Sequence, residues 1–475
     1  MRINHNSLAL NASSHFAKVN DNIAKSMSRL SSGYKITNPS DDAAGLAIST
    51  RMDSQIRGLD RASLNSNDGI SVIQSAEGGL NEIHSVLERM RELATRAAND
   101  VLSEDDRDAI QEEIDALTQE IDQIVDTTAF NEQKLLDGSV SRRSMSSVFS
   151  IQATYISGDV APGSYELSIT SIAERATYTT GMTYSTATIT KEQAGTVNVN
   201  GFGVEITEGM TMTEVYEELQ SHLQKIGVDV FASSDGGETK EDFSSGSPVI
   251  FRSNEYGADQ KISIKIGNDQ LASLLGMSDG DEEVGKDCVA SITSTDKGFS
   301  TSATYTADGN DLTIIDRNGF EMKVSIDPDN FDPAESSTVI EVMTAGVMTI
   351  QTGAYSGEEL KIDIPNIDSK SLKIDNLIMY THDYASQAIE AIDEAVKRIS
   401  NIRSKLGAYE NRLNDIYDNL EVQGESLTAA YSRIMDTDMA EEMTNYTQQD
   451  VLAQAAISMM QKSNERPESL LQLLQ

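Results

Sequence analysis

Residues 30–49, LSSGYKITNPSDDAAGLAIS, form a turn-forming break between two long stretches of helical pattern. Gly33 can end the first helix, because glycine adopts the left-handed cap conformation at little cost. Asn38 and Pro39 then direct the backbone away from helical angles. Ser40 or Asp41 can cap the next helix by accepting hydrogen bonds from its first amides, where acidic side chains also suit the helix dipole. The stretch therefore predicts a corner between two helices.

Before this corner, small and apolar residues recur three and four apart, which is the spacing of a coiled-coil seam. After the corner the pattern continues to Asn99, and a further helix capped by Ser103 is predicted to end near Thr127. Because these stripes are narrow, each terminal helix needs a partner helix to fold stably. The predicted seam of the first helix consists of Ala9, Ala12, Phe16, Val19, Ile23, Ser26 and Leu30.

The C-terminal part repeats this pattern. A second stripe lies between Met439 and Met460, and Pro467 is predicted to end its helix. In the helix before it, Arg403 and Glu410 fall on the predicted seam, where a polar layer that fixes the register is favoured over a catalytic pair. That seam consists of Ala385, Ile389, Ile392, Val396, Ile399, Arg403, Leu406, Glu410, Leu413, Tyr417 and Leu420.

Between the two ends the apolar pattern changes to a period of two, which is typical of half-buried strands. Residues 149–152, 165–169 and 360–364 show this alternation, and residues 197–277 predict a small module with a hairpin, a helix over 213–226 and further strands. The sequence therefore predicts an α+β fold. Its core is a long antiparallel coiled coil built from both chain ends, with a β-rich α+β insert in the middle.

Charge and composition exclude several classes of function. The net charge of −39 argues against nucleic acid as a partner and against adsorption to an anionic membrane. No stretch approaches the roughly 20 apolar residues of a membrane span. The N-terminus lacks the apolar region of a signal peptide, so we expect the protein to stay in the cytoplasm or to leave by a route without a cleavable signal. The single cysteine, Cys288, excludes an intramolecular disulfide and is predicted to be buried and inert.

No catalytic or metal-binding motif is found. The five histidines are scattered, and the sequence contains no His-Glu-x-x-His pair, no phosphate-binding glycine loop and no Gly-x-Ser-x-Gly elbow. We therefore expect no enzymatic activity, no cofactor and no metal. Patterned ends around a β-rich middle fit a subunit that polymerises into a helical filament, and they fit a closed bundle with an insert equally well.

Several long motifs resemble those of bacterial flagellins. They are residues 30–49, residues 64–80 (LNSNDGISVIQSAEGGL), residues 403–413 (RSKLGAYENRL) and the ending from Pro467. The resemblance covers about residues 1–152 and 350–475. It implies a subunit that assembles with itself into the flagellar filament for motility. It also implies export in an unfolded state through the flagellar type III apparatus, and an extracellular location on the bacterial flagellum.

The resemblance further implies a division of the chain. Residues 1–32 and 435–475 would form the terminal helices of the inner filament tube, residues 33–152 and 350–434 the coiled-coil core with a β-hairpin, and residues 153–349 a variable surface-exposed insert. The implied partners are other copies of the chain, an export chaperone at the C-terminal segment, and the filament cap and hook-associated proteins. The assembly residues on the terminal stripes would be Phe16, Val19, Ile23, Leu30, Met443, Tyr446, Ile457 and Met460.

Recognition by Toll-like receptor 5 is also implied. Residues 87–94 (LERMRELA) and 110–114 (IQEEI) resemble the segments that this receptor contacts in flagellins, which places receptor-binding roles on Arg89, Leu93 and Glu113. Glu88 departs from the glutamine usual before that arginine. Arg89 and Leu93 are four residues apart and share a helix face. In the alternative interpretation, all three residues serve only the coiled-coil core.

Three other functions remain as alternatives. A hook–filament junction protein shares the end motifs, but the long match at residues 30–49 and the C-terminal ending favour flagellin. An enzyme displayed on the filament through the insert would need a catalytic motif, and the zinc motif is absent. A cytosolic helical scaffold would close its terminal stripes within one molecule.

Overall fold

The computed structural model describes residues 6–99, 101–157, 160–181, 188–237, 239–243, 247–292, 298–316, 320–333, 336–343 and 346–472. The chain divides into two compact units. The first contains residues 1–68, 351–359 and 412–475, and the second contains residues 69–350 and 360–411. The helices are α1 (Ser7–Ser32), α2 (Ala43–Ala97), α3 (Glu104–Thr127), α4 (Met212–Gln224), α5 (Asp269–Leu275), α6 (His382–Met435) and α7 (Met439–Gln472).

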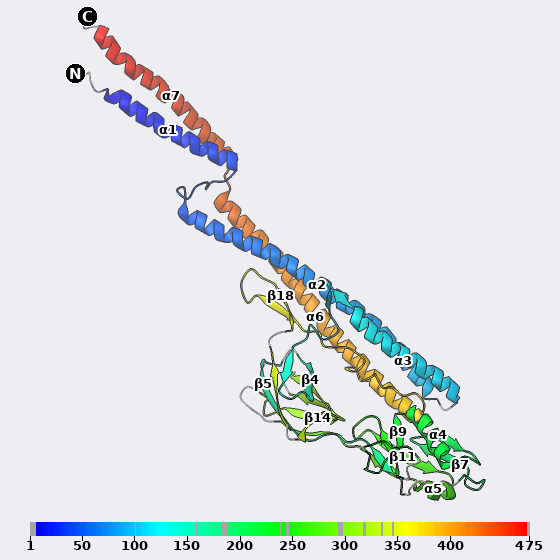
Figure 1. Cartoon of the computed structure of the whole chain (residues 1–475). Coiled ribbons are helices and arrows are strands. Elements are labelled where there is room, and N and C mark those ends of the chain that lie inside the picture. The colour runs from blue at the N-terminus through cyan, green and yellow to red at the C-terminus, as the bar shows by residue number, and fades with distance from the viewer. Residues whose placement is uncertain are drawn as a thin grey trace. The chain divides into compact units, whose positions relative to one another are not determined.

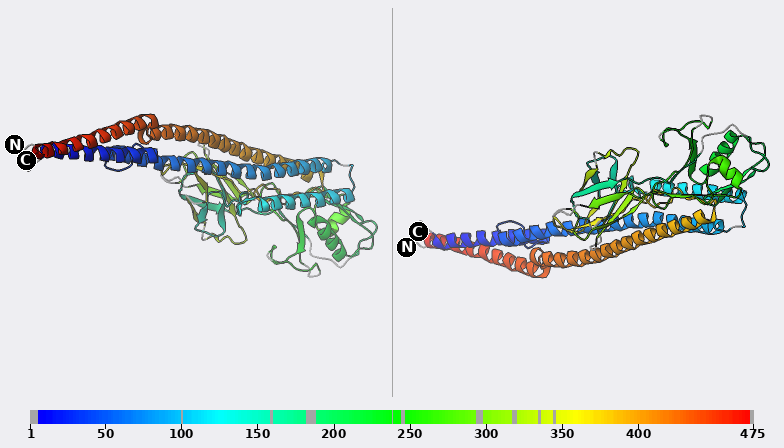
Figure 2. Two further views of the ribbon diagram at one scale, coloured as in Figure 1. Left: turned by 90° about the horizontal axis from the view of Figure 1, so that it is seen from above. Right: turned by 90° about the horizontal axis from the view of Figure 1, so that it is seen from below.

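In the first unit, α1 and α7 lie side by side and antiparallel, with the two chain ends at the same end of the pair (Figures 1 and 2). The seven residues of the predicted α1 seam are all buried or half-buried, while most of the residues between them are exposed. The heptad prediction for the N-terminal helix is therefore confirmed residue by residue.

In the second unit, α2, α3 and α6 form a helical core. Ser103 caps α3 in a capping box with Asp106, as its predicted N-cap role requires, and the helix ends at Thr127. From Gly69 onward α2 buries residues on two faces, because it packs against both other helices. The apolar residues of α2 and α3 that are almost fully buried include Ile73, Ala76, Leu80, Ile83, Leu87, Met90, Ile114 and Ile121.

The predicted seam of α6 is only partly correct. Ala385, Ile392, Ile399, Leu406, Leu413 and Leu420 are buried as expected. The residues between these seam positions differ from the prediction by one position. The buried residues are Ala388, Ala395 and Ile402. The predicted residues Ile389, Val396 and Arg403 are only half-buried.

Arg403 and Glu410 therefore flank the seam rather than lie on it. They make polar contacts with α2 instead: Arg403 lies 3.6 Å from Glu77, and Gln74 donates to Glu410 at 2.9 Å. These contacts lie at the partly exposed edge of the seam. The expectation of a polar layer within the seam was wrong.

The middle of the chain folds into β-sheets around two hydrophobic cores. The sandwich core lies between sheets ordered β13-β5-β17-β3 and β14-β15-β16-β4. The module core lies among α4, α5 and sheets ordered β12-β11-β7-β8 and β6-β10-β9. The expected hairpin pairs β7 with β8 through a turn at Asn200 and Gly201, both with positive φ.

The strands are short. Two further pairs, β1-β2 and β18-β19, are separate two-stranded sheets. The bounds are β1 (Ala129–Phe130), β2 (Gln133–Lys134), β3 (Ser144–Ser146), β4 (Ile151–Ile156), β5 (Gly163–Ser171), β6 (Thr177–Thr179), β7 (Gly195–Val199), β8 (Phe202–Ile206), β9 (Val228–Ala232), β10 (Val249–Ser253), β11 (Lys261–Ile266), β12 (Glu282–Val284), β13 (Val289–Ile292), β14 (Thr304–Asp308), β15 (Asp311–Ile315), β16 (Glu321–Ile326), β17 (Ser337–Val342), β18 (Met348–Gln351) and β19 (Glu359–Ile362).

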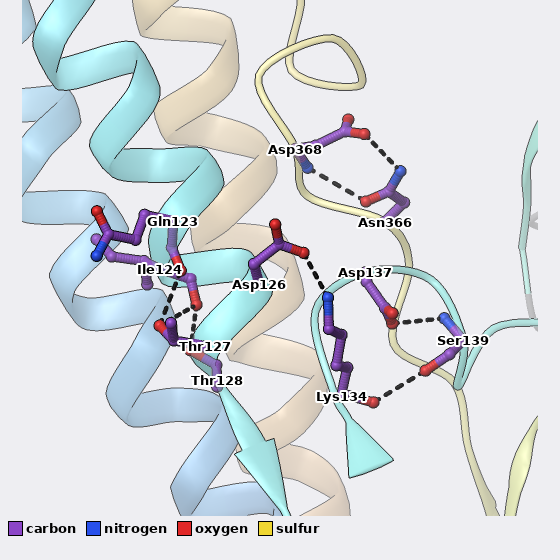
Figure 3. A network of polar contacts seen from close by, with 10 residues as sticks. All are labelled: Gln123, Ile124, Asp126, Thr127, Thr128, Lys134, Asp137, Ser139, Asn366 and Asp368. Carbon is purple, nitrogen blue, oxygen red and sulfur yellow. Dashed lines mark hydrogen bonds and ion pairs between the residues drawn. The ribbon is translucent and has the colours of Figure 1, made fainter. Parts of the chain in front are cut away.

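Side-chain hydroxyls close the C-terminal end of α3 (Figure 3). Thr127 donates to the carbonyl of Gln123 at 2.8 Å, and Thr128 donates to the carbonyl of Ile124 at 2.6 Å. The Ile124 carbonyl also accepts from the Thr128 amide, so these hydroxyl bonds add second donors to carbonyls in the last turn of α3. Gly79 of α2 lies against this end, since a Cβ there would stand 2.6 Å from the Thr128 Oγ1 atom. Glycine at position 79 therefore allows α2 to approach α3 closely.

The single cysteine lies in the sandwich core. Cys288 is 2% exposed, which confirms the prediction of a buried thiol. Burial and the nearby carboxylates of Asp287 and Asp311 raise the pKa of Cys288 to about 11. Almost no thiolate is therefore present at neutral pH.

We expect Cys288 to resist alkylation by iodoacetamide at about pH 8 in the native protein, because the thiol is both buried and protonated. Intact-mass spectrometry should show one added group only after unfolding in urea. Rapid alkylation of the native chain would contradict this account of the sandwich core.

Candidate assembly and receptor surfaces

The corner at residues 30–49, which connects α1 to α2, pairs with the segment that connects α6 to α7. Gly33 ends α1 in the left-handed conformation, with φ of 76°, and its amide donates to the carbonyl of Arg29 at 2.8 Å. The backbone then pairs with the segment between α6 and α7: Lys35 donates to Met435 at 2.5 Å, and Thr437 donates to Gly33 at 2.9 Å. The two helix connections are thus held together by main-chain hydrogen bonds.

Asp42, rather than Ser40 or Asp41, caps α2. Its Oδ1 atom accepts from the amides of Ala44 at 3.0 Å and Gly45 at 2.9 Å. Gly45 leaves room for this carboxylate, because a Cβ there would stand 2.6 Å from the Asp42 Oδ2 atom. The expected cap was wrong because the helix begins only at Ala43, so Asp42 is the residue within reach of its first free amides.

Asp41 instead closes the turn that precedes α2. Its Oδ2 atom accepts from the amide of Asn38 at 3.1 Å, and from the amide and hydroxyl of Thr37 at 3.3 and 3.2 Å. The hydrogen bond from the Asn38 amide is the main cause that lowers the pKa of Asp41, and the Thr37 bonds add to it. The ionised carboxylate therefore stabilises the turn.

We expect the turn at Asp41 to loosen in acid. Since the folded pKa lies below the unfolded value near 3.8, the stabilisation is complete above roughly pH 5 and is lost as the pH falls through the folded pKa. Carboxyl-carbon NMR should show one aspartate titrating below 3.8 that disappears in Asp41→Asn. If the resonance lost in that variant titrates at the ordinary value, the assignment of this turn is wrong.

Two polar contacts fix the register of α1 against α7. Near one end, Asn6 contacts Ser463; near the other, Arg29 lies 3.8 Å from Glu442. Phe16 is ten residues after Asn6 and Ala453 is ten before Ser463, so the two lie level. A bulky residue is thus opposite a small one. The α7 side of the seam consists of the half-buried or buried Glu442, Tyr446, Gln449, Ala453, Ala456, Met460 and Ser463.

Asn6 also explains why Pro467 does not end α7. Proline has no amide hydrogen, so within a helix it leaves the carbonyl four residues earlier without its donor. That carbonyl belongs to Ser463, and the Asn6 Nδ2 atom donates to it at 3.0 Å. Meanwhile the Asn6 Oδ1 atom caps α1 by accepting from the amide of Ala9 at 3.1 Å. The predicted helix end at Pro467 was wrong, since α7 continues to Gln472.

The eight candidate assembly residues fall on two different surfaces. Phe16, Val19, Ile23, Leu30, Tyr446 and Met460 lie on the α1–α7 seam. Met443 and Ile457 are 50% and 40% exposed, so they lie outside it. They belong to a larger set of exposed apolar side chains, which we call the outer apolar set. It consists of Leu8, Leu10, Met27, Met439, Met443, Val451, Leu452, Ile457 and Met459.

The candidate receptor residues lie in the second unit. Arg89 of α2 donates to the Glu113 Oε1 atom of α3 through Nε at 3.0 Å and Nη2 at 2.7 Å, and to Glu92 at 2.6 Å. These bonds, with Glu113 first, raise the pKa of Arg89. Both side chains of the Arg89–Glu113 pair remain almost half exposed. Leu93 does not join them at the surface, because it is 2% exposed.

The seams at both chain ends, the exposed apolar residues along the terminal helices and the β-rich insert define a structural protein built to associate. Residues 3–141 match the family model of the bacterial flagellin N-terminal helical region, and residues 389–474 match that of the C-terminal helical region.

The chain is also similar along its whole length to curated flagellins. A flagellin of Clostridium tyrobutyricum is 33% identical over 98% of this chain and 100% of its own. A flagellin of Bacillus subtilis is 30% identical over 100% of both chains. Flagellin B of Vibrio anguillarum is 29% identical over 100% of this chain and 99% of its own. The chain belongs to the bacterial flagellin family.

It is therefore a structural, non-enzymatic subunit of the flagellar filament and a component of the extracellular flagellum. Membership of this family decides between a filament subunit and a closed bundle in favour of the filament, because a filament subunit must contact its neighbours. Across the described ranges, none of the helices has an apolar stretch long enough to cross a membrane.

Proposed function

We propose that the terminal segments, residues 1–32 and 435–475, form the inner tube of the filament, with two surfaces that act differently. The α1–α7 seam joins the two ends of one chain. The outer apolar set contacts neighbouring copies. The observation that carries this proposal is the exposure of large apolar side chains along both terminal helices, with Leu10 at 76% and Met459 at 71%. Several large apolar side chains left exposed along one pair of helices favour an interaction surface.

The same segments suit export in an unfolded state through the flagellar type III apparatus. The chain has a single cysteine, so no intramolecular disulfide has to be opened or formed. Its seam is narrow and contains alanine, serine and glutamate, so the terminal helices are held weakly before assembly. An export chaperone would cover the apolar residues of α7 until they meet their neighbours. Filament cap and hook-associated proteins would contact the same terminal segments.

Residues 33–152 and 350–434 would form the outer coiled-coil core of the filament, and residues 153–349 would face the solvent. Ser337 and Glu341, exposed on β17, are polar outward-facing residues that support that position. A solvent-facing insert can vary without disturbing the contacts that build the tube.

We expect Leu10→Asp and Met459→Asp to raise the critical concentration for polymerisation at least about tenfold, because each buries a charge at a contact repeated in every subunit. Seeded polymerisation followed by sedimentation and electron microscopy measures this. Val289→Asp, at an apolar residue 45% exposed on β13, is the matched control and should polymerise normally. Equal polymerisation of all three variants would mean that the outer apolar set does not take part in assembly.

We also propose that Toll-like receptor 5 contacts this chain at the Arg89–Glu113 pair. Both side chains project from adjacent helices into solvent, and the ion pair holds the guanidinium in one orientation. A partner that replaces or shares these hydrogen bonds gains a charged contact of fixed geometry. Leu93 lies beneath this surface and supports the helix packing, so any contact of its own needs a local rearrangement.

We expect Arg89→Ala and Glu113→Ala to weaken receptor activation at least about tenfold, which is the loss typical of a central interface residue. Arg91→Ala is the matched control: Arg91 is on the same helix, is also half exposed, and contacts Asp393 of α6 instead. A reporter-cell assay on the monomer, with circular dichroism to verify folding, measures the effect. Equal losses in all three variants would assign Arg89 and Glu113 to core stability alone.

A further inference from the structure

The insert contains a cleft where the chain crosses between its two hydrophobic cores. Ala173 belongs to the sandwich core and Ala176 to the module core, so the chain crosses at Glu174 and Arg175. It crosses again after Phe251 of the module core, because Tyr256 packs against the sandwich core. A cleft of about 590 Å³ lies at these crossings. Boundaries between packed units are frequent places for ligand sites.

Two arginines line this cleft without an ion pair. The Arg175 guanidinium stacks on the Tyr256 ring at 4.3 Å from its centroid, and Arg252 stacks on the Phe231 ring at 4.7 Å. Among the residues that the structure describes, neither guanidinium lies within ion-pair distance of a carboxylate. Arg252 makes one hydrogen bond, to the carbonyl of Gly237 at 3.1 Å. In a chain with 76 acidic and 37 basic residues, two unpaired arginines in one cleft are unexpected.

The cleft contains arginine donors that have no acceptor among the described residues. The Nε atoms of both arginines are buried and find no hydrogen-bond partner in the part of the chain that the structure describes, although buried donors are normally satisfied. The two guanidinium groups also lie near the same phenol: burial raises the pKa of Tyr256, and both Arg175 and Arg252 oppose that shift. Arg175 thus stacks on the Tyr256 ring, and Arg252 adds a second positive charge nearby.

Most of the carboxylates that line the cleft are already engaged. Glu174 accepts from Lys286 at 2.7 Å, and Asp329 accepts from the Tyr256 hydroxyl at 3.2 Å. Glu283, the third, is exposed on the edge strand β12. The arginines are therefore left as the groups with unused donors.

We propose that this cleft binds an oxyanion, a phosphate, sulfate or carboxylate group, between Arg175 and Arg252. A guanidinium presents a planar fork of donors that fits two oxygens of such a group. Stacking on Tyr256 and Phe231 restricts the orientation of each guanidinium. Because Arg252 comes from the module and Arg175 from the crossing that leaves the sandwich, the bound anion also links the two halves of the insert. The group can belong to a free small anion or to an acidic polysaccharide.

Isothermal titration calorimetry of the full chain tests this proposal at constant ionic strength. The probes are inorganic phosphate, sulfate and citrate for free anions, tri-galacturonate for an acidic polysaccharide, and maltotriose as the neutral control. We expect saturable binding of at least one anionic probe at one site, and none of maltotriose. The anion that binds most tightly identifies the source.

Arg175→Gln and Arg252→Gln should each weaken that binding at least about tenfold, since each removes one fork. Arg175→Lys should also weaken it, because an ammonium keeps the charge but not the planar fork. Lys265→Gln is the matched control: it removes one positive charge from an exposed position on β11 of the same module and should bind normally.

Thermal melting separates binding from folding. If Arg175→Gln melts at a lower temperature than the unchanged chain, Arg252→Lys, which keeps the charge and the aliphatic stem, is tested instead and is expected to weaken anion binding. Non-saturable heats, or equal affinity in the arginine variants and Lys265→Gln, would overturn the proposal, because both results mean general charge screening rather than a site.

Discussion

The pairing of two narrow apolar stripes from opposite ends of the chain is the interaction on which the terminal unit depends. Its α1 side contains two alanines and a serine beside four larger apolar residues, and its α7 side includes Glu442 and Gln449. Most side chains of this seam are only half-buried, while ordering each residue costs on the order of 1–2 kcal/mol of backbone entropy. The pair is therefore weakly held, and further apolar contacts are needed to stabilise it.

The second unit is built differently. There α2 buries two faces, α3 carries a complete capping box, and two separate hydrophobic cores support the insert. Regions with many buried contacts open rarely, whereas sparsely packed ends open often. This contrast suits a filament subunit: a stable part retains its shape before assembly, and the ends remain free to form their final contacts within the polymer.

The sequence predicted the fold to the extent that local patterns determine it. The α1 seam, the Ser103 cap and the β7–β8 hairpin each follow from a short run of residues, and each is present in the structure. Errors arose where a distant partner decides the outcome. In α6, for example, Ala388, Ala395 and Ile402 are buried in place of the predicted seam residues one position later, because the face that meets the other helices is set by tertiary packing.

The same reason explains the other differences. Pro467 reads as a helix end only when Asn6, far away in the sequence, is ignored. The connector pairing of Lys35 with Met435 leaves no mark in either local pattern. For the candidate site residues, spacing placed Arg89 and Leu93 on one face, but spacing carries no information on burial. Leu93 is covered by packing among three helices, which only the tertiary structure reveals.

One seam joins α1 to α7 of the same chain, and we propose that the outer apolar set joins neighbouring chains. Electron cryo-microscopy of assembled filaments at side-chain resolution tests it most directly. We expect Phe16 to pack level with Ala453 of its own chain, and Leu10 and Met459 to be buried against other copies. A filament in which Leu10 and Met459 remain exposed, or in which Phe16 packs on α7 of another subunit, would contradict it.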